Sequence, residues 1–105
     1  MALTRSFKDT VKARADRDPV FRIGLFQEAM NAFMDGDVET GKIVLRDYVN
    51  ATVGFEKLGK ELDKSPKNLM RMLSAKGNPR TDNLFAVLAH LKAQEKVSLT
   101  FEAVD

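Results

Sequence analysis

The sequence predicts an all-α fold of five or six helices, followed by a short C-terminal β-strand. Apolar residues recur at three- and four-residue spacing along most of the 105 residues, as they do on the buried face of a helix. Asp18-Pro19 and Ser65-Pro66 are each typical of a capping residue followed by the first residue of a helix. The hydrophobic fraction of 44% is enough for the core of one small domain.

The first two helices are expected at residues 4–17 and 19–34. The first is weakly amphipathic and has Thr4 or Ser6 as its N-cap. The second begins at Asp18-Pro19 and is apolar on nearly every side, so it has to be covered on two sides. One side faces the core, and the other needs the first helix, a second subunit or another protein.

The remaining helices follow from capping residues and apolar spacing. Asp35-Gly36-Asp37 ends the second helix and caps the next one, and Thr81 caps the last helix of the chain. The helices between these caps are predicted at residues 38–51, 55–62 and 66–75. Each of them carries apolar residues at helical spacing, so each is expected to bury one face.

The end of the chain has a different pattern. Residues 97–101 alternate between apolar and polar side chains, which is typical of a strand. A lone strand leaves its main-chain groups unpaired, so it needs a partner such as the same strand of a second subunit. We therefore divide the chain into an N-terminal helical arm (1–18), a helical domain (19–96) with a helix-turn-helix at 55–75, and a C-terminal tail (97–105).

The composition argues against several kinds of site. The chain has no cysteine and a single histidine, His90, so it offers neither a disulfide nor a thiolate or histidine-rich metal site. Paired carboxylates such as Asp35/Asp37 and Glu61/Asp63 are interpreted as helix caps rather than as a general acid–base pair. We expect no enzyme activity, no metal and no cofactor. No segment has the apolar length of a signal peptide or a membrane span, which predicts a cytoplasmic protein without a membrane partner.

Positive charge is concentrated between Lys64 and Arg80. This window holds five Lys and Arg residues and no acidic residue, whereas the other 88 residues hold 12 basic and 15 acidic side chains. The window therefore has a net charge of +5, and the rest of the chain has a net charge of −3. A basic segment of this kind favours a polyanionic partner, above all the phosphate backbone of double-stranded DNA.

Residues 55–75, which overlap this window, have the features of a helix-turn-helix. The first helix of such a unit needs a small residue where the two helices touch, and Gly59 provides it. Asp63 stands where such turns often hold glycine, and Asp tolerates the left-handed conformation better than most residues. Lys64 stands where an apolar residue is usual, so the turn departs from the common pattern at two positions.

The second helix of the unit, predicted at 66–75, divides into two faces. At 100° per residue, Leu69, Met72 and Leu73 fall on the side that is expected to be buried. The residues expected to contact DNA lie on the opposite face, at the N-terminus of the helix or in the loop that follows: Ser65, Lys67, Asn68, Met70, Arg71, Ser74, Lys76 and Arg80.

Seven of these residues divide into two roles, and Ser74 is placed only on the exposed side of the helix. Arg71, Lys67 and Met70 are expected to read bases, because arginine pairs bidentately with guanine and methionine can contact a thymine methyl group. Ser65, Asn68, Lys76 and Arg80 are expected to position phosphates. The alternative is that the charged face is only solvated surface, which is the usual role of Lys and Arg on a helix. The all-helical context and the acid-free window favour DNA binding.

Residues 62–88, L-x-x-S-P-K-N-L-M-R-M-L-S-A-K-G-N-P-R-T-D-N-L-F-A-V-L, carry a family likeness. They resemble the addiction-module antidote (antitoxin) proteins with a Cro/CI-type (XRE, λ-repressor-like) helix-turn-helix, chiefly through the short helix followed by Lys76–Arg80. The likeness extends over about residues 20–100. It implies a λ-repressor-like bundle in a prokaryotic transcriptional regulator. Such a homodimer would repress its own toxin–antitoxin or prophage-like operon by binding the operator, and would neutralise a RelE/ParE-like toxin.

A second hypothesis belongs to another class of protein. The strongly apolar helix at 19–34 and the unpaired strand at 97–101 are also consistent with a protein-interaction module. Such a module would neutralise a RelE/ParE-like toxin and have little DNA affinity of its own.

Overall fold

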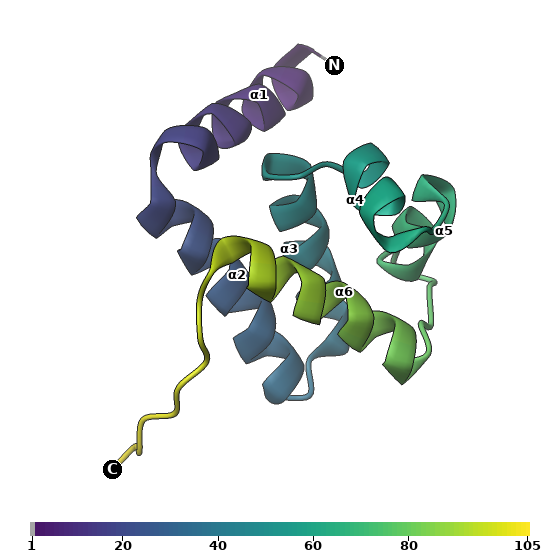
Figure 1. Ribbon diagram of the computed structural model, residues 1–105. Helices are drawn as coiled ribbons and strands as arrows, with labels where there is room; N and C mark the ends of the chain where they lie inside the picture. Colours follow the sequence, from purple (N-terminus) through teal and green to yellow (C-terminus); the bar gives the residue numbers. More distant parts are fainter. Residues whose placement is uncertain (1) are drawn as a thin grey trace.

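Residues 2–105 form six helices, which are joined by short connections and followed by an extended tail (Figure 1). The computed structural model describes the main chain of residues 2–105 and the side chains from Asp9 onward. The helices are α1 (Ala2–Arg17), α2 (Pro19–Met34), α3 (Val38–Ala51), α4 (Phe55–Leu62), α5 (Pro66–Met72) and α6 (Thr81–Glu95). The predicted all-α class is confirmed. Within residues 2–105, no helix is long and apolar enough to cross a bilayer.

One core is shared by α2 through α6. α2 and α3 lie side by side as an antiparallel pair, and α6 crosses them while α4 and α5 close the remaining end (Figure 1). The buried apolar residues of this core are Phe26, Ala29, Leu45, Tyr48, Val49, Phe55, Leu58, Leu69, Leu73, Val87, Leu88 and Leu91. Every one of these five helices contributes to this core, so the short α5 is packed on the same core as the longer helices.

The strongly apolar α2 is covered on one further side by α1, as one of the sequence alternatives proposed. Ala15 of α1 is fully buried, and the Arg14 guanidinium lies 4.5 Å from the centre of the Phe21 ring. Part of α2 nevertheless stays uncovered, because Val20 is 82% exposed and Met34 is 71% exposed. Apolar side chains this exposed at the two ends of α2 leave room for a second contact.

Three predicted caps are confirmed by hydrogen bonds. The side chain of Asp18 accepts from the Phe21 N–H, that of Asp37 from the Thr40 N–H, and that of Ser65 from the Asn68 N–H. Each bond satisfies one of the main-chain N–H groups that have no partner inside the first turn of a helix. The helix starts at residues 19, 38 and 66 are therefore fixed by short-range chemistry.

Two other predicted caps were wrong. α1 begins at Ala2, so Thr4 and Ser6 lie within the helix instead of before it; their side chains lie outside the described residues. Thr81 is the first residue of α6, and Arg80 occupies the cap position without a side-chain hydrogen bond. The side chain of Asp82 accepts a hydrogen bond from the N–H of the next residue, Asn83.

The helix predicted at 66–75 is shorter than expected and ends at Met72. The Arg71 carbonyl accepts hydrogen bonds from both the N–H and the hydroxyl group of Ser74, which closes the last turn tightly. Gly77 then returns so close to the helix end that a Cβ atom at this position would overlap with the Arg71 carbonyl oxygen. The return of the loop over the helix end explains why helical spacing alone overestimated the length of α5.

The predicted strand at 97–101 is also wrong for the single chain. Residues 97–105 form no strand in the described structure. They form an extended tail, of which residues 97–101 border α2 while the end points away from the helices (Figure 1). The physical reason is that a strand needs a second strand as its partner. The described elements before this segment are all helices, so they offer no sheet edge with which it could pair.

Candidate nucleic-acid interface

The turn between α4 and α5 consists of residues 63–65. Asp63 has φ 54° and ψ 47°, which is the left-handed conformation predicted for it. Its N–H is directed at the Gly59 and Lys60 carbonyl oxygens, so it closes the C-terminus of α4. Ser65 then caps α5, and Pro66 occupies the first helical position. Asp63 therefore adopts the left-handed conformation at a position where glycine is more common.

Gly59 allows the two helices to approach each other. A Cβ atom on Gly59 would lie 2.6 Å from the Lys64 carbonyl oxygen and 3.3 Å from the ring of Pro66. The first of these distances is shorter than a Cβ atom tolerates, so only glycine permits this crossing without moving the turn. The prediction that Gly59 is the small residue at the helix contact is confirmed.

α5 has a buried face and an exposed face, as its sequence predicted. Leu69 is 1% exposed and Leu73 at the helix end is 2% exposed, whereas Met70 is 45% exposed. Lys67 and Arg71 are exposed as well, and Met72 is half-buried. The core contacts of Leu69 and Leu73 therefore hold the helix with its cationic side chains turned to solvent.

A hollow of about 700 Å³ lies between α5, the loop that follows it and the start of α6. Five of the eight predicted DNA contacts line it: Ser65, Asn68, Arg71, Ser74 and Lys76. Lys67, Met70 and Arg80 lie outside its lining. Lys64 and Asn83, which were not assigned a contact, also line the hollow, and Asp63 is its only acidic lining residue among those described. The hollow is thus rich in hydrogen-bond donors and in positive charge.

Some of the predicted contacts are already engaged with neighbouring groups. Ser65 Oγ accepts from the Asn68 N–H, which leaves its own hydroxyl proton available as a donor. The Ser74 hydroxyl donates to the Arg71 carbonyl, so it keeps only acceptor capacity. The Arg80 guanidinium lies 3.5 Å from a carboxylate oxygen of Asp82, and both side chains are largely exposed. An anion that binds Arg80 has to compete with this carboxylate.

Lys42 of α3 is a residue of this region that the sequence analysis did not single out. Its side chain is only 4% exposed, and its Nζ donates to the Gly77 carbonyl oxygen at 2.7 Å. This bond ties the loop that carries Lys76 to the core helix α3. The signal in the sequence was the position of a lysine in line with Leu45 and Val49, one and two turns further along the buried face of α3.

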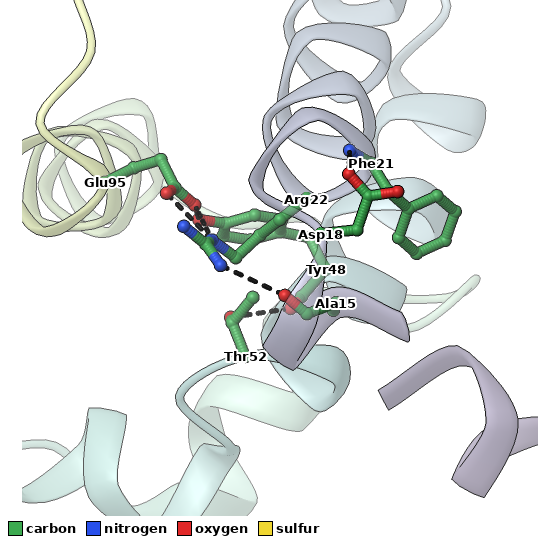
Figure 2. Close-up of polar contacts among 7 residues, drawn as sticks. All are labelled: Ala15, Asp18, Phe21, Arg22, Tyr48, Thr52 and Glu95. Atoms are coloured by element: carbon green, nitrogen blue, oxygen red, sulfur yellow. Dashed lines mark hydrogen bonds and ion pairs between the residues drawn. The ribbon is translucent and has the colours of Figure 1, made fainter. Parts of the chain in front are cut away.

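A second polar cluster joins α1, α2, α3 and α6 on the opposite side of the core. Figure 2 shows Arg22 directed at both Glu95 and the end of α1: its Nε donates to the two Glu95 carboxylate oxygens at 2.8 and 2.9 Å, and its Nη1 donates to the Ala15 carbonyl at 3.0 Å. The Tyr48 hydroxyl donates to the same carboxylate. Burial, and then the adjacent Glu95, raise the pKa of Tyr48 above its ordinary value.

His90, the single histidine of the chain, lies half-buried on α6 beside α4. Its Nε2 lies 2.8 Å from Glu61 Oε1, and Gln94 Nε2 donates to the same oxygen at 2.6 Å. The hydrogen bond with His90 lowers the pKa of Glu61. The contact ties α6 to the helix that precedes the turn at 63–65.

The chain matches no protein-family model, and comparison with curated proteins and with solved structures yields no match. The assignment of a function therefore depends on the geometry and charge of the region around α5.

Proposed function

We propose that the protein is a sequence-specific DNA-binding transcriptional regulator of the helix-turn-helix class. In this proposal α4 and α5 form a λ-repressor-like helix-turn-helix, and α5 enters the major groove. The protein acts as a homodimer on the operator of a toxin–antitoxin or prophage-like operon, which it represses. The membership of this class rests on the resemblance of residues 62–88 and on the arrangement of α4, the turn and α5.

The observation that carries the proposal is the exposed face of α5. Leu69 and Leu73 fix this short helix to the core. Lys67, Met70 and Arg71 are therefore exposed on a helix whose position is fixed. A rigidly held helix with long donors on its free face is what base reading in the major groove requires. The hollow beside it supplies further donors from Asn68 and Lys76.

The charge distribution supports the same partner. The cationic window 64–80 coincides with the turn, α5 and the loop that returns over its end. Positive charge around one short exposed helix attracts the phosphate backbone, and phosphate contacts set the register in which base-reading side chains act. The loop that carries Lys76 is also held in place, because the buried Lys42 donates to the Gly77 carbonyl.

The test is the affinity of an Arg71→Ala variant for a duplex selected from a random pool by the wild-type protein. Loss of a bidentate base contact should weaken binding by about 1–3 kcal/mol and relax the preference at one base pair. Arg17→Ala, which removes an exposed arginine from α1, is the matched control and should bind as the wild type does. If Arg71→Ala binds its selected site as tightly as the wild type, α5 is not the reading helix.

The exposed apolar ends of α2 favour one other function. Val20 and Met34 fit a protein-interaction module that neutralises a RelE/ParE-like toxin with little DNA binding of its own. One measurement distinguishes the two functions. A monomeric protein that leaves DNA unshifted at about 50 mM salt, where non-specific binding is strongest, favours the interaction module over the regulator.

A further inference from the structure

The tail after α6 has main-chain groups that no described part of the chain pairs. The Val97 N–H is directed at the Lys92 carbonyl, and within the described chain residues 98–105 form no main-chain hydrogen bond. Two apolar side chains of this segment face solvent, since Leu99 is 48% exposed and Phe101 is 90% exposed. An extended segment with free donors, free acceptors and an apolar face is able to pair with another extended chain.

The tail also borders an apolar groove on α2. Ile23, Phe26, Met30 and Met34 lie at helical spacing along one stripe of this helix, and together with residues 97–101 they line a hollow of about 330 Å³. Val97 packs against the core at one end of the groove. The groove lining carries no charged side chain. An apolar occupant therefore fits it, and a charged one does not.

We propose that this segment is the interface between two copies of the chain. The tails of the two copies pair antiparallel about a twofold axis at Leu99, and their apolar side chains cover the α2 stripes of both copies. The single chain leaves the segment unpaired because the missing partner is the same segment of the second copy.

The sequence of the tail fits a second copy as the occupant. Val97-Ser98-Leu99-Thr100-Phe101 is symmetric about Leu99 in its alternation of apolar and polar residues. A twofold axis at Leu99 places Val97 opposite Phe101 of the second copy and Leu99 opposite its own counterpart. The hydroxyl residues Ser98 and Thr100 are paired on the other face. Apolar pairs and hydroxyl pairs that are directly opposite each other stabilise an antiparallel ribbon.

Other registers fit less well. An axis at Phe101 would place the charged Asp105 opposite Val97 and the charged Glu102 opposite Thr100. The axis at Leu99 keeps both acidic residues outside the paired segment. A shift by a single residue between the two tails would turn the apolar side chains to opposite faces, which removes the contact with α2.

The inference deepens the dimer of the proposed function, and it is tested without DNA. The chain contains no cysteine, so a Leu99→Cys variant has a single thiol. The two residues at the twofold axis have Cβ atoms about 4.5–5.5 Å apart, close enough for a disulfide after a small adjustment. We expect this variant to form a covalent dimer on mild oxidation. Thr100→Cys is the matched control and should stay largely uncrosslinked, because residue 100 faces residue 98 of the second copy.

A second pair of variants tests the energetic role of the apolar face. Sedimentation of the wild type should give about twice the chain mass of 11.8 kDa. Leu99→Asp should sediment as a monomer, and Thr100→Asp, which adds the same charge on the other face, should remain a dimer. Circular dichroism checks that both variants keep the helices, since residue 99 lies outside the core.

Three outcomes would overturn the interface: a monomeric wild type, a Leu99→Asp variant that stays dimeric, or equal crosslinking of the two cysteine variants. A monomeric wild type would leave the tail and groove to a partner protein instead. Failure of the interface and failure of the proposed function are distinguishable. A monomer that shifts DNA overturns the interface, whereas a tail-linked dimer that leaves DNA unshifted at low salt overturns the function.

Discussion

At the scale of single residues, Lys42 shows where a local pattern misleads. A lysine on a helix is ordinarily placed in solvent, yet Lys42 lies on the buried face of α3 and donates to the carbonyl of Gly77, 35 residues away. A buried amine without a hydrogen-bond acceptor is strongly unfavourable, so the loop that provides this acceptor is held in place. Its position among apolar residues was visible in the sequence, but its partner was not.

The residue-scale prediction concerns the carboxyl group of Glu61. Replacing His90 with alanine removes the hydrogen bond that contributes most to lowering the pKa of Glu61, so this pKa should rise towards its ordinary value. Carboxyl resonances followed by NMR through a pH titration measure it directly. Lys57→Met is the control, because the charge of Lys57 is the weakest of the causes that lower this pKa.

The same contact predicts a dependence of stability on pH. A carboxyl group whose pKa is lower in the folded state stabilises the fold above its unfolded pKa of about 4.3. That contribution is lost as the pH falls through the lower, folded pKa. His90→Ala should therefore reduce the loss of stability in acid relative to the wild type. An unchanged Glu61 titration in His90→Ala would show that the two side chains do not interact in solution.

At the scale of elements, the sequence predicted most helix boundaries, and the boundaries depend on different kinds of contact. The starts of α2, α3 and α5 depend on Asp18, Asp37 and Ser65, whose hydrogen-bond partners lie three residues away. The end of α5 depends on Gly77, which folds back over the helix through contacts with α3. The tail at 97–105 depends on a partner outside the single chain. A pattern of a few residues indicates a hydrogen bond between neighbours in sequence. It does not indicate the return of a loop or a contact with another chain.

The element-scale prediction tests the crossing of α4 and α5. Gly59→Ala places a methyl group 2.6 Å from the Lys64 carbonyl, so the turn has to move. We expect the free energy of unfolding to fall by about 1–3 kcal/mol, as for other overpacked sites. Gly24→Ala on α2 is the matched control, because no atom lies within 4 Å of the added methyl group. It should raise the stability by about 0.5–1 kcal/mol, since alanine favours the helix.

Urea unfolding of the two variants provides the comparison, and the sign of the difference decides it. Opposite signs support a close crossing of α4 and α5. Equal stabilisation by both substitutions would mean that the Lys64 carbonyl lies further from residue 59 than the 2.6 Å to an added Cβ atom implies. The turn at Asp63 would then lose its role in positioning α5.

At the scale of the whole molecule, the fold gathers charge that the sequence shows only as a run. The window 64–80 becomes the turn, a short helix and a loop, and these surround one hollow with Arg71 and Lys76 in its lining. The sequence predicted which face of α5 is exposed, because helical spacing determines it. It did not predict the hollow, the anchoring of the loop by Lys42 or the pairing of Arg80 with Asp82, because each depends on how the loop returns.

The measurement that tests DNA binding by this surface most directly is the salt dependence of affinity. Fluorescence anisotropy of a labelled random-sequence duplex should show binding at about 50 mM salt that weakens steeply towards 200 mM. Lys76→Met should reduce the slope of log K against log salt by about 0.9, the value for one lost phosphate contact. Lys96→Met, at the far end of α6, should leave the slope unchanged. Absence of binding at 50 mM, or equal slopes for the two variants, would contradict the assignment of this surface to DNA.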